Sequence, residues 1–173
     1  MILKTPRLVL RPWKESDAEC LYHFAKNPKI GPIAGWPPHK NVEESLEIIK
    51  TIFSKKETYA ITIDDKAIGS IALLFYPNTN HYWKDKGVEL GYWIGEDYWG
   101  QRLTVEACQE LIRHGFEDLN INKIYASFRD ENHQSKRVLE KLGFKYYCDM
   151  ENTDYSGKET REIAMFLENN LKK

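Results

Sequence analysis

The sequence is poor in cysteine and lacks any long apolar run that is free of polar residues. Its three cysteines, Cys20, Cys108 and Cys148, lie far apart, which favours reduced thiols over a disulfide framework. The longest uncharged run, residues 67–83, contains proline, asparagine and threonine, so it is not expected to form a membrane helix. Residues 1–14 alternate apolar and basic side chains and do not resemble a signal peptide. We expect a soluble protein of the cytoplasm.

An excess of charge is also missing. Lys and Arg number 25 and Asp and Glu number 26, so the formal net charge is -1. This balance creates no extended positive field and argues against nucleic acid as a partner. The five histidines are never spaced as paired ligands on one helix, so no metal site is expected. A length of 173 residues, 42% of them apolar, is enough for one domain with its own core, and we expect that domain to span residues 1–173.

Hydrophobic patterns and turn residues predict a mixed fold. We expect strands at residues 8–11, 59–63, 67–76, 87–94, 123–128, 144–150 and 160–167, and helices at residues 16–27, 41–57, 101–119 and 132–142. Residues 30–40 hold two glycines and three prolines and are expected to form a loop. The expected fold class is therefore α/β in the broad sense (α+β), with a mostly antiparallel sheet, flanking helices and β-α-β-α-β units late in the chain.

The first motif with chemical meaning lies where a strand passes into a helix. Residues 89–94 read Glu-Leu-Gly-Tyr-Trp-Ile, and residues 99–107 read Trp-Gly-Gln-Arg-Leu-Thr-Val-Glu-Ala. A glycine at such a junction lets backbone amides close around an anion, and the helix dipole favours negative charge there. Taken alone, Gly100 is more simply interpreted as a turn glycine.

The second motif covers residues 132–144. Asn132 stands where a helix N-cap belongs, Ser135 follows three residues later, and Gly143 stands where a C-cap belongs. Each of these residues has a structural explanation by itself. The order and spacing of the two motifs together carry the functional signal.

Together the motifs resemble the GNAT superfamily of acetyl-coenzyme A-dependent N-acetyltransferases. The likeness is greatest to the branch that acetylates the amino termini of ribosomal proteins, and it covers nearly the whole chain through residues 5–12, 89–94, 99–107 and 132–144. The resemblance implies a GNAT-like single domain in which the central strand splays from its neighbour and forms the coenzyme A cleft. It also implies acetyl-coenzyme A as co-substrate.

The resemblance assigns the coenzyme contacts residue by residue. The implied contacts are the strand backbone of Tyr92, Trp93 and Ile94 for pantetheine, the loop of Gly100, Gln101, Arg102, Leu103 and Thr104 for pyrophosphate, Asn132 for the pantetheine amides, and Ser135, Lys136 or Arg137 for the outer coenzyme. Arg102 departs from the family pattern, which usually has glycine or alanine there. A helical backbone at Arg102 would leave its amide pointing at phosphate, with the guanidinium either adding a contact or crowding the ligand.

The implied reaction is acyl transfer to an amine by direct attack in a ternary complex. Glu89 is the candidate general base, because it shares a strand face with Gly91 and Trp93 beside the coenzyme edge. The alternative for Glu89 is a structural or substrate-orienting carboxylate paired with Arg or Lys. Many GNAT enzymes protonate the departing thiolate with a tyrosine, but the matching residue here is Leu139. Candidate substitutes for that acid are Ser135, Tyr146 and Tyr147.

The acceptor amine is the least determined part of the prediction. By resemblance, the loops that carry Trp36, Tyr82 and Trp83 border the acceptor cleft, so these aromatic residues are the candidate substrate contacts. A peptide or protein α-amine is favoured, and a small amine such as an antibiotic or polyamine is the alternative. A third alternative is an acyl-coenzyme A-binding module without turnover. The chain is also compatible with a homodimer.

Overall fold

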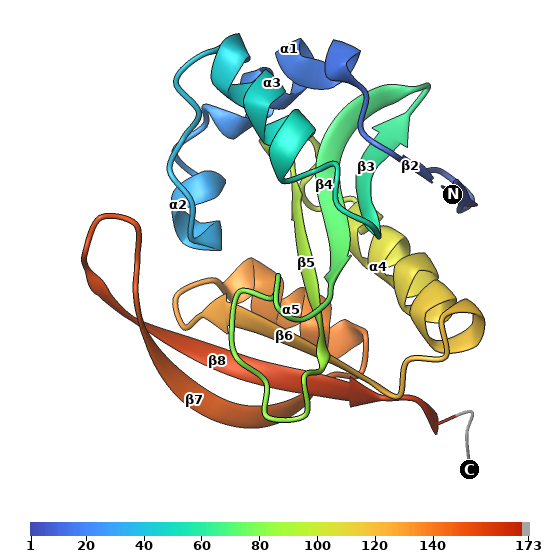
Figure 1. Ribbon diagram of the computed structural model, residues 1–173, viewed down its shortest axis with the longest axis vertical. Helices are drawn as coiled ribbons and strands as arrows, with labels where there is room; N and C mark the ends of the chain where they lie inside the picture. Colours follow the sequence, from blue (N-terminus) through green and yellow to red (C-terminus); the bar gives the residue numbers. More distant parts are fainter. Residues whose placement is uncertain (171–173) are drawn as a thin grey trace.

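The computed structural model (Figure 1) describes residues 1–170 of the chain. Its strands form one eight-stranded sheet in the order β1-β2-β3-β4-β5-β6-β8-β7. The strands are β1 (Leu3–Lys4), β2 (Val9–Arg11), β3 (Thr58–Ile63), β4 (Lys66–Leu74), β5 (Val88–Ile94), β6 (Lys123–Arg129), β7 (Lys145–Thr153) and β8 (Glu159–Glu168). The helices are α1 (Ala18–Ala25), α2 (Gly31–Ala34), α3 (Val42–Thr51), α4 (Leu103–Arg113) and α5 (His133–Lys141). Short helical turns lie at Glu15–Asp17, Glu96–Tyr98 and His114–Asp118.

The pairing of β5 with β6 divides this sheet into two parts. These strands run parallel and pair only at Val88 with Ile124 and at Glu89 with Tyr125. The other neighbouring strands of the described sheet are antiparallel. Five residues of β5, from Leu90 to Ile94, therefore extend beyond its contact with β6. The splayed central strand expected from the sequence is confirmed.

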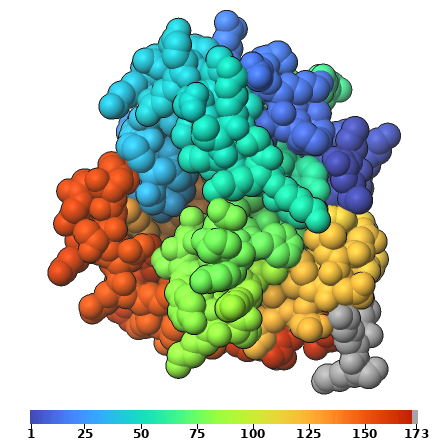
Figure 2. Space-filling view, in the orientation of Figure 1, coloured from blue at the N-terminus to red at the C-terminus, as the bar shows by residue number. Residues whose placement is uncertain are grey.

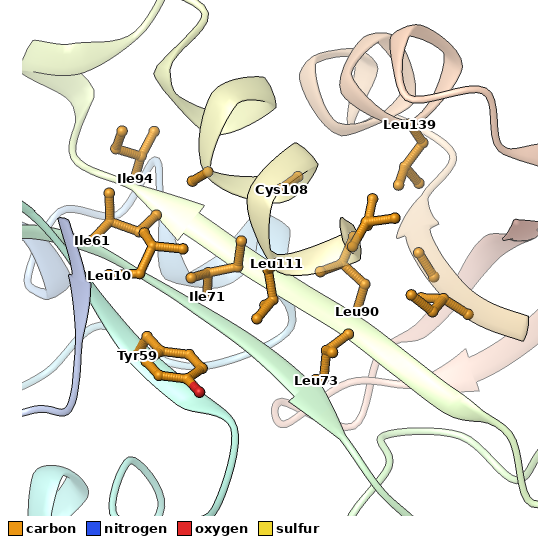
Figure 3. Close-up of a cluster of buried hydrophobic side chains, with 14 of the residues drawn as sticks. Leu10, Tyr59, Ile61, Ile71, Leu73, Leu90, Ile94, Cys108, Leu111 and Leu139 are labelled. Carbon is orange, nitrogen blue, oxygen red and sulfur yellow. The ribbon is translucent and has the colours of Figure 1, made fainter. Parts of the chain in front are cut away.

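The two faces of β5 pack against different helices. Leu90 and Ile94 belong to the main core, together with Leu111 of α4 and Leu139 of α5 (Figure 3). Trp93 points to the opposite face and packs against the cluster formed by α1 and α3. This alternation follows from the two-residue period of a strand and gives the sheet an α4–α5 side and an α1–α3 side.

Several predicted boundaries are wrong in ways that the backbone explains. The expected loop at residues 30–40 contains the short helix α2, which begins with Gly31-Pro32, and proline is well tolerated in a first helical turn. The helix predicted at 41–57 ends at Thr51, and Glu57 has a left-handed backbone with φ 58°. The helix predicted at 101–119 begins only at Leu103, because Arg102 is left-handed, and it ends in a π-helical turn.

The last third of the chain forms fewer parallel pairs than predicted. After α5 the chain folds back as the β7–β8 hairpin, and β8 inserts antiparallel between β6 and β7. The expected series of β-α-β-α-β units is therefore reduced to the parallel pair β5 and β6 in the described sheet. None of the helices within residues 1–170 combines the length and the apolar character that crossing a bilayer requires.

Candidate active site

A cleft of about 550 Å³ lies at the end of β5. Its walls come from β5, α2, the start of α4 and the start of α5. Ten of the predicted coenzyme contacts line it: Tyr92, Trp93, Ile94, Gly100, Arg102, Leu103, Thr104, Asn132, Ser135 and Arg137. Gln101 does not, because its side chain donates to the carbonyl of Asp97 and its own carbonyl accepts from Arg7. The structure therefore brings the two sequence motifs together around one cavity.

The free edge of β5 is the first element of this cleft. Beyond Glu89, β5 has no strand partner on its β6 side among the described residues. Backbone N–H and C=O groups of residues 90–94 that face this side are thus open to a ligand that can pair with a strand edge, except the Ile94 carbonyl, which accepts from Trp99 Nε1 at 3.1 Å. An extended chain of amide groups has the hydrogen-bonding pattern that such an edge recognises.

The loop before α4 is the second element. Gly100 has φ 75° and Arg102 has φ 62°, so two left-handed residues flank Gln101. Arg102 is the N-cap of α4 and was expected to be helical, so this part of the prediction is wrong. Alternating handedness of this kind curves successive backbone N–H groups around a concavity that suits an anion.

The start of α4 also differs from the starts of α3 and α5. Asn41 caps α3 by accepting from the amide of Glu44, and Asn132 caps α5 by accepting from the amide of Ser135. No side chain caps α4 within the described residues. The amides of its first turn, residues 103–105, have no intrahelical acceptor and open on the cleft, where an anion would satisfy them.

Tyr92 and Ser135 join the strand wall of the cleft to the α5 wall. The Tyr92 hydroxyl lies 2.8 Å from Ser135 Oγ and 3.3 Å from the Ser135 carbonyl oxygen. Burial raises the pKa of Tyr92, so the phenol stays protonated and able to donate. The other two candidate acids lie outside the cleft lining: Tyr146 donates to Asp149, and Tyr147 packs against Phe166.

Glu89 does not have the access that the predicted general base needs. It is 2% exposed and is not among the residues that line the cleft. Its carboxylate accepts hydrogen bonds from Asn80 Nδ2 at 2.7 Å, from the His81 amide at 3.2 Å and from Trp83 Nε1 at 3.0 Å. These donors are neutral, not the Arg or Lys of the alternative interpretation. Glu89 therefore holds the β4–β5 loop against the sheet.

The predicted acceptor aromatics fall into three different environments. Trp36 is half-buried and packs edge-on against Trp93, with ring centroids 5.7 Å apart. Tyr82 is 71% exposed, beside Tyr76. Trp83 is 3% exposed and stacks on Tyr125, so its predicted contact with an acceptor is wrong for this structure: the ring is a packing residue.

Sequence reasoning missed polar and cationic residues around the site. Lys29, which lies in neither motif, lines the cleft together with Arg102, Arg137 and Lys141. On the other side of the sheet, His81 of the β4–β5 loop is paired with Glu162 of β8. No motif links positions 81 residues apart, so only the fold could reveal this pair. Within residues 1–170, no group of three His, Cys, Asp or Glu side chains is placed to hold a metal ion.

Comparison with known proteins identifies this arrangement. The profile of the family described as acetyltransferase (GNAT) domain matches residues 7–145, which is most of the chain. The chain therefore belongs to the GNAT acetyltransferase family and is an acyltransferase. Members of this family use acetyl-coenzyme A.

Individual relatives agree with this membership. The chain is 28% identical to a Bacillus licheniformis protein named uncharacterized N-acetyltransferase p20, over 99% of this chain and 96% of that protein. It is 30% identical to the ribosomal-protein-serine acetyltransferase of Escherichia coli, over 63% of this chain and 62% of that enzyme.

Solved structures share the fold. A GNAT-family acetyltransferase from Bacillus anthracis superposes with a TM-score of 0.83 at 18% identity, covering 98% of this chain and 99% of that one. RimL, a ribosomal α-N-protein acetyltransferase solved in complex with coenzyme A, superposes with a TM-score of 0.79 at 20% identity, covering 97% and 98%.

Proposed function

We propose that this GNAT N-acetyltransferase moves the acetyl group of acetyl-coenzyme A to the α-amine of a peptide or protein, by direct attack in a ternary complex. The observation that carries the proposal is the parting of β5 and β6 beside a cleft whose lining includes Trp93, on the α1–α3 side, as well as residues of α4 and α5. A thioester lying along the free edge of β5 could be reached by an amine from that opposite side. The relatives named as ribosomal-protein acetyltransferases support a protein α-amine as the acceptor.

The residues of the cleft fit coenzyme A. The strand edge suits the amides of pantetheine, and the uncapped start of α4 suits a pyrophosphate. Three cationic side chains, Arg102, Arg137 and Lys141, line the same cavity and would balance phosphate charge, whereas Lys29 of the lining is ion-paired with Glu96. When bound, acetyl-coenzyme A supplies a thioester whose carbonyl carbon accepts the amine and whose thiolate leaves.

The chain's own groups would stabilise both charges that develop during transfer. The proposed donor to the oxyanion is a backbone amide of β5, at Trp93 or Ile94. The hydrogen bond between the Ser135 hydroxyl and Tyr92 supports Ser135 as the proposed donor of a proton to the departing thiolate. Asn132 keeps its Oδ1 on the Ser135 amide, which leaves its Nδ2 as a donor for pantetheine.

Two features on the α1–α3 side support a peptide acceptor. A Cβ built on Gly91 would meet only Leu74 Cδ1, at 3.9 Å, so there is open space beside the strand. Arg129, at the end of β6, ion-pairs with Asp154 through Nη2, while its buried Nε has no hydrogen-bond partner among residues 1–170. A peptide offers carbonyl oxygens that such a donor needs, whereas a polyamine offers none.

Release of free coenzyme A thiol tests the proposal directly. The acceptors are a peptide with a free α-amine, the same peptide with a blocked α-amine and a free lysine, and a simple polyamine. We expect release with the first peptide only. Release with the polyamine instead would establish the small-amine alternative. Calorimetric binding of coenzyme A without release from any acceptor would establish the binding module and overturn the proposed reaction.

The cytoplasmic location and the homodimer stay predictions from the sequence. Cell fractionation checks the first, and sedimentation of the purified chain checks the second.

A further inference from the structure

A buried acid–base cluster lies on the α1–α3 side of the sheet, outside the coenzyme cleft. His81 Nε2 is 2.9 Å from Glu162 Oε2. The same carboxylate accepts from Ser127 Oγ and from Asn152 Nδ2, each at 3.1 Å. One ionisable pair is thus held by the β4–β5 loop and by β6, β7 and β8 at once. Figure 2 shows this loop (green) on the surface, below the helical segment around residues 30–55 (cyan) and beside the β7–β8 hairpin (orange and red).

The cluster borders the place where the two central strands separate. Glu89 and Tyr125 form the last pair between β5 and β6. Because strand side chains alternate, Gly91 lies two residues further along the face of Glu89, and Ser127 lies two residues further along the face of Tyr125. Ser127 contacts Glu162, and Glu89 accepts from the amide of His81. The His81–Glu162 pair therefore lies on the acceptor side of the opening.

Acetylation of an α-amine requires a group that takes a proton there. A free α-amine has a pKa of roughly 7.7–8.0, so much of it is protonated at neutral pH and cannot attack. Histidine is suited to this proton transfer, because its pKa lies close to the working pH. With Nε2 donating to Glu162, the lone pair of His81 is on Nδ1. The side chain of His81 keeps 14% of its surface exposed.

Charged neighbours on several elements change the pKa of His81. Burial is the largest single influence and lowers its pKa, but the hydrogen bond to Glu162 and the charges of Glu89 and Glu162 outweigh it, so the pKa is raised above 6.5. The hydrogen bond from His81 in turn lowers the pKa of Glu162 to about 2, against the opposing effect of burial. Glu162 stays ionised across the whole working range. Only His81 of this pair can exchange a proton near neutral pH.

We propose that His81, oriented by Glu162, takes the proton from the acceptor amine; this inference rests on the proposed function above. A proton passes from the ammonium nitrogen to His81 Nδ1, and the neutral amine then forms a C–N bond with the thioester carbonyl carbon. The nitrogen then loses its second proton as the C–S bond breaks, and the departing thiolate takes up one proton, so the products are the amide and free coenzyme A thiol. Glu162 is a positioning residue, and Glu89 positions the loop that carries His81.

The pH dependence of kcat/KM separates a base from a structural histidine. Because His81 must be neutral to accept a proton, wild-type activity should rise with pH through a pKa above 6.5. His81→Gln should lose about 10²-fold in kcat/KM with a peptide α-amine, and its remaining pH dependence should follow the acceptor amine. With an aryl amine, which is already neutral at pH 7, the same variant should lose little. A purely structural role would lower both activities equally.

Glu162→Gln gives a second, independent result. Removal of its charge should lower the pKa of His81 and move the rising limb of the profile to lower pH. Glu159→Gln, on the same strand but exposed, is the matched control and should keep the wild-type profile. Coenzyme A binding by calorimetry establishes that each variant is folded.

Different results would overturn the role of His81 and the proposed function. A His81→Gln profile parallel to wild type, or an equal loss with both amines, overturns the inference while the transferase function stands. If the rising limb of the kcat/KM profile does not move in Glu162→Gln, that result also contradicts the inference. This variant gives a result even if His81→Gln fails to fold. A wild-type protein that acetylates no amine refutes the proposed function, and this inference with it.

Discussion

The two sides of β5 are built by different means. The coenzyme side consists of backbone: a free strand edge, two left-handed residues and an uncapped helix start. The proposed acceptor side consists of side chains that come from four elements and includes the His81–Glu162 pair. Backbone groups recognise the part of the reaction shared by the whole family. Side chains from loops and late strands are where a member can differ in its acceptor.

Filling the acceptor side should produce the largest effect. Gly91→Val places two methyl groups in open space next to the separation of β5 and β6. We expect kcat/KM for a peptide acceptor to fall about 10²-fold, because small displacements of a reacting group cost that much. Coenzyme A affinity, measured by calorimetry, should stay at the wild-type value.

Gly91→Ala is the control for that substitution. Its single methyl group would make only an ordinary contact with Leu74, 3.9 Å away. Near wild-type turnover is expected. Equal loss in both variants would show that the strand backbone, not the space, had been disturbed.

On the coenzyme side, Arg102 combines a charge with a strained backbone. Loss of a charge-assisted contact should weaken coenzyme A binding roughly tenfold in Arg102→Glu. Arg102→Gly should bind coenzyme A more tightly than Arg102→Glu does, because the curved backbone remains. Tighter binding by Arg102→Gly than by wild type would mean that the side chain crowds the phosphate.

The same glycine variant should be more stable than wild type. A left-handed conformation costs an L-residue about 1 kcal/mol, which glycine avoids. For a chain of this size that corresponds to a rise in Tm of roughly 2–4 °C. An unchanged or lower Tm would show that the guanidinium contributes compensating contacts.

Loss of the Tyr92–Ser135 hydrogen bond should have a smaller effect than the substitutions at Gly91 and Arg102. A thiolate is a good leaving group, so Ser135→Ala and Tyr92→Phe should each lower kcat by less than the roughly 10²-fold typical of general acids. If the two hydroxyls act together, the double variant should resemble the single ones. Additive losses would assign them separate roles.

The smallest effect compares two helix caps with the same chemistry. Asn132→Ala and Asn41→Ala should each lose about 1 kcal/mol of unfolding free energy, measured by urea denaturation. Only Asn132 lies in the cleft, so only its substitution should also raise KM for acetyl-coenzyme A. An equal KM in both variants would remove Asn132 from the coenzyme site.

The sequence predicts which residues come together at the cleft, because these positions depend on local signals. Glycine at residue 100 and asparagine at residue 132 report turns and caps within a few positions of themselves. The family resemblance placed ten contacts around one cavity for the same reason. Arg102 is the exception, since a left-handed arginine has no local sequence signal.

The acceptor side could not be predicted in the same way. Strand alternation predicts the face of β5 on which Glu89 lies. Its role depends on three donors from the β4–β5 loop, whose path the pattern does not define. The sequence places Trp83 in a loop and so predicts an exposed side chain, whereas in the structure Trp83 stacks on Tyr125. The partner of His81 lies in the last strand. Contacts of this range are products of topology, which strand and helix periodicity do not encode.

The narrow junction between β5 and β6 has a consequence for stability. Two residue pairs join the five amino-terminal strands to the three carboxy-terminal ones, so the sheet has an edge in its interior. A ligand that pairs with that edge would add backbone hydrogen bonds between two halves that otherwise meet through side chains. Occupancy of the cleft would then strengthen the cohesion of the whole sheet, and amides of β5 would exchange with solvent more slowly as coenzyme concentration rises above its dissociation constant.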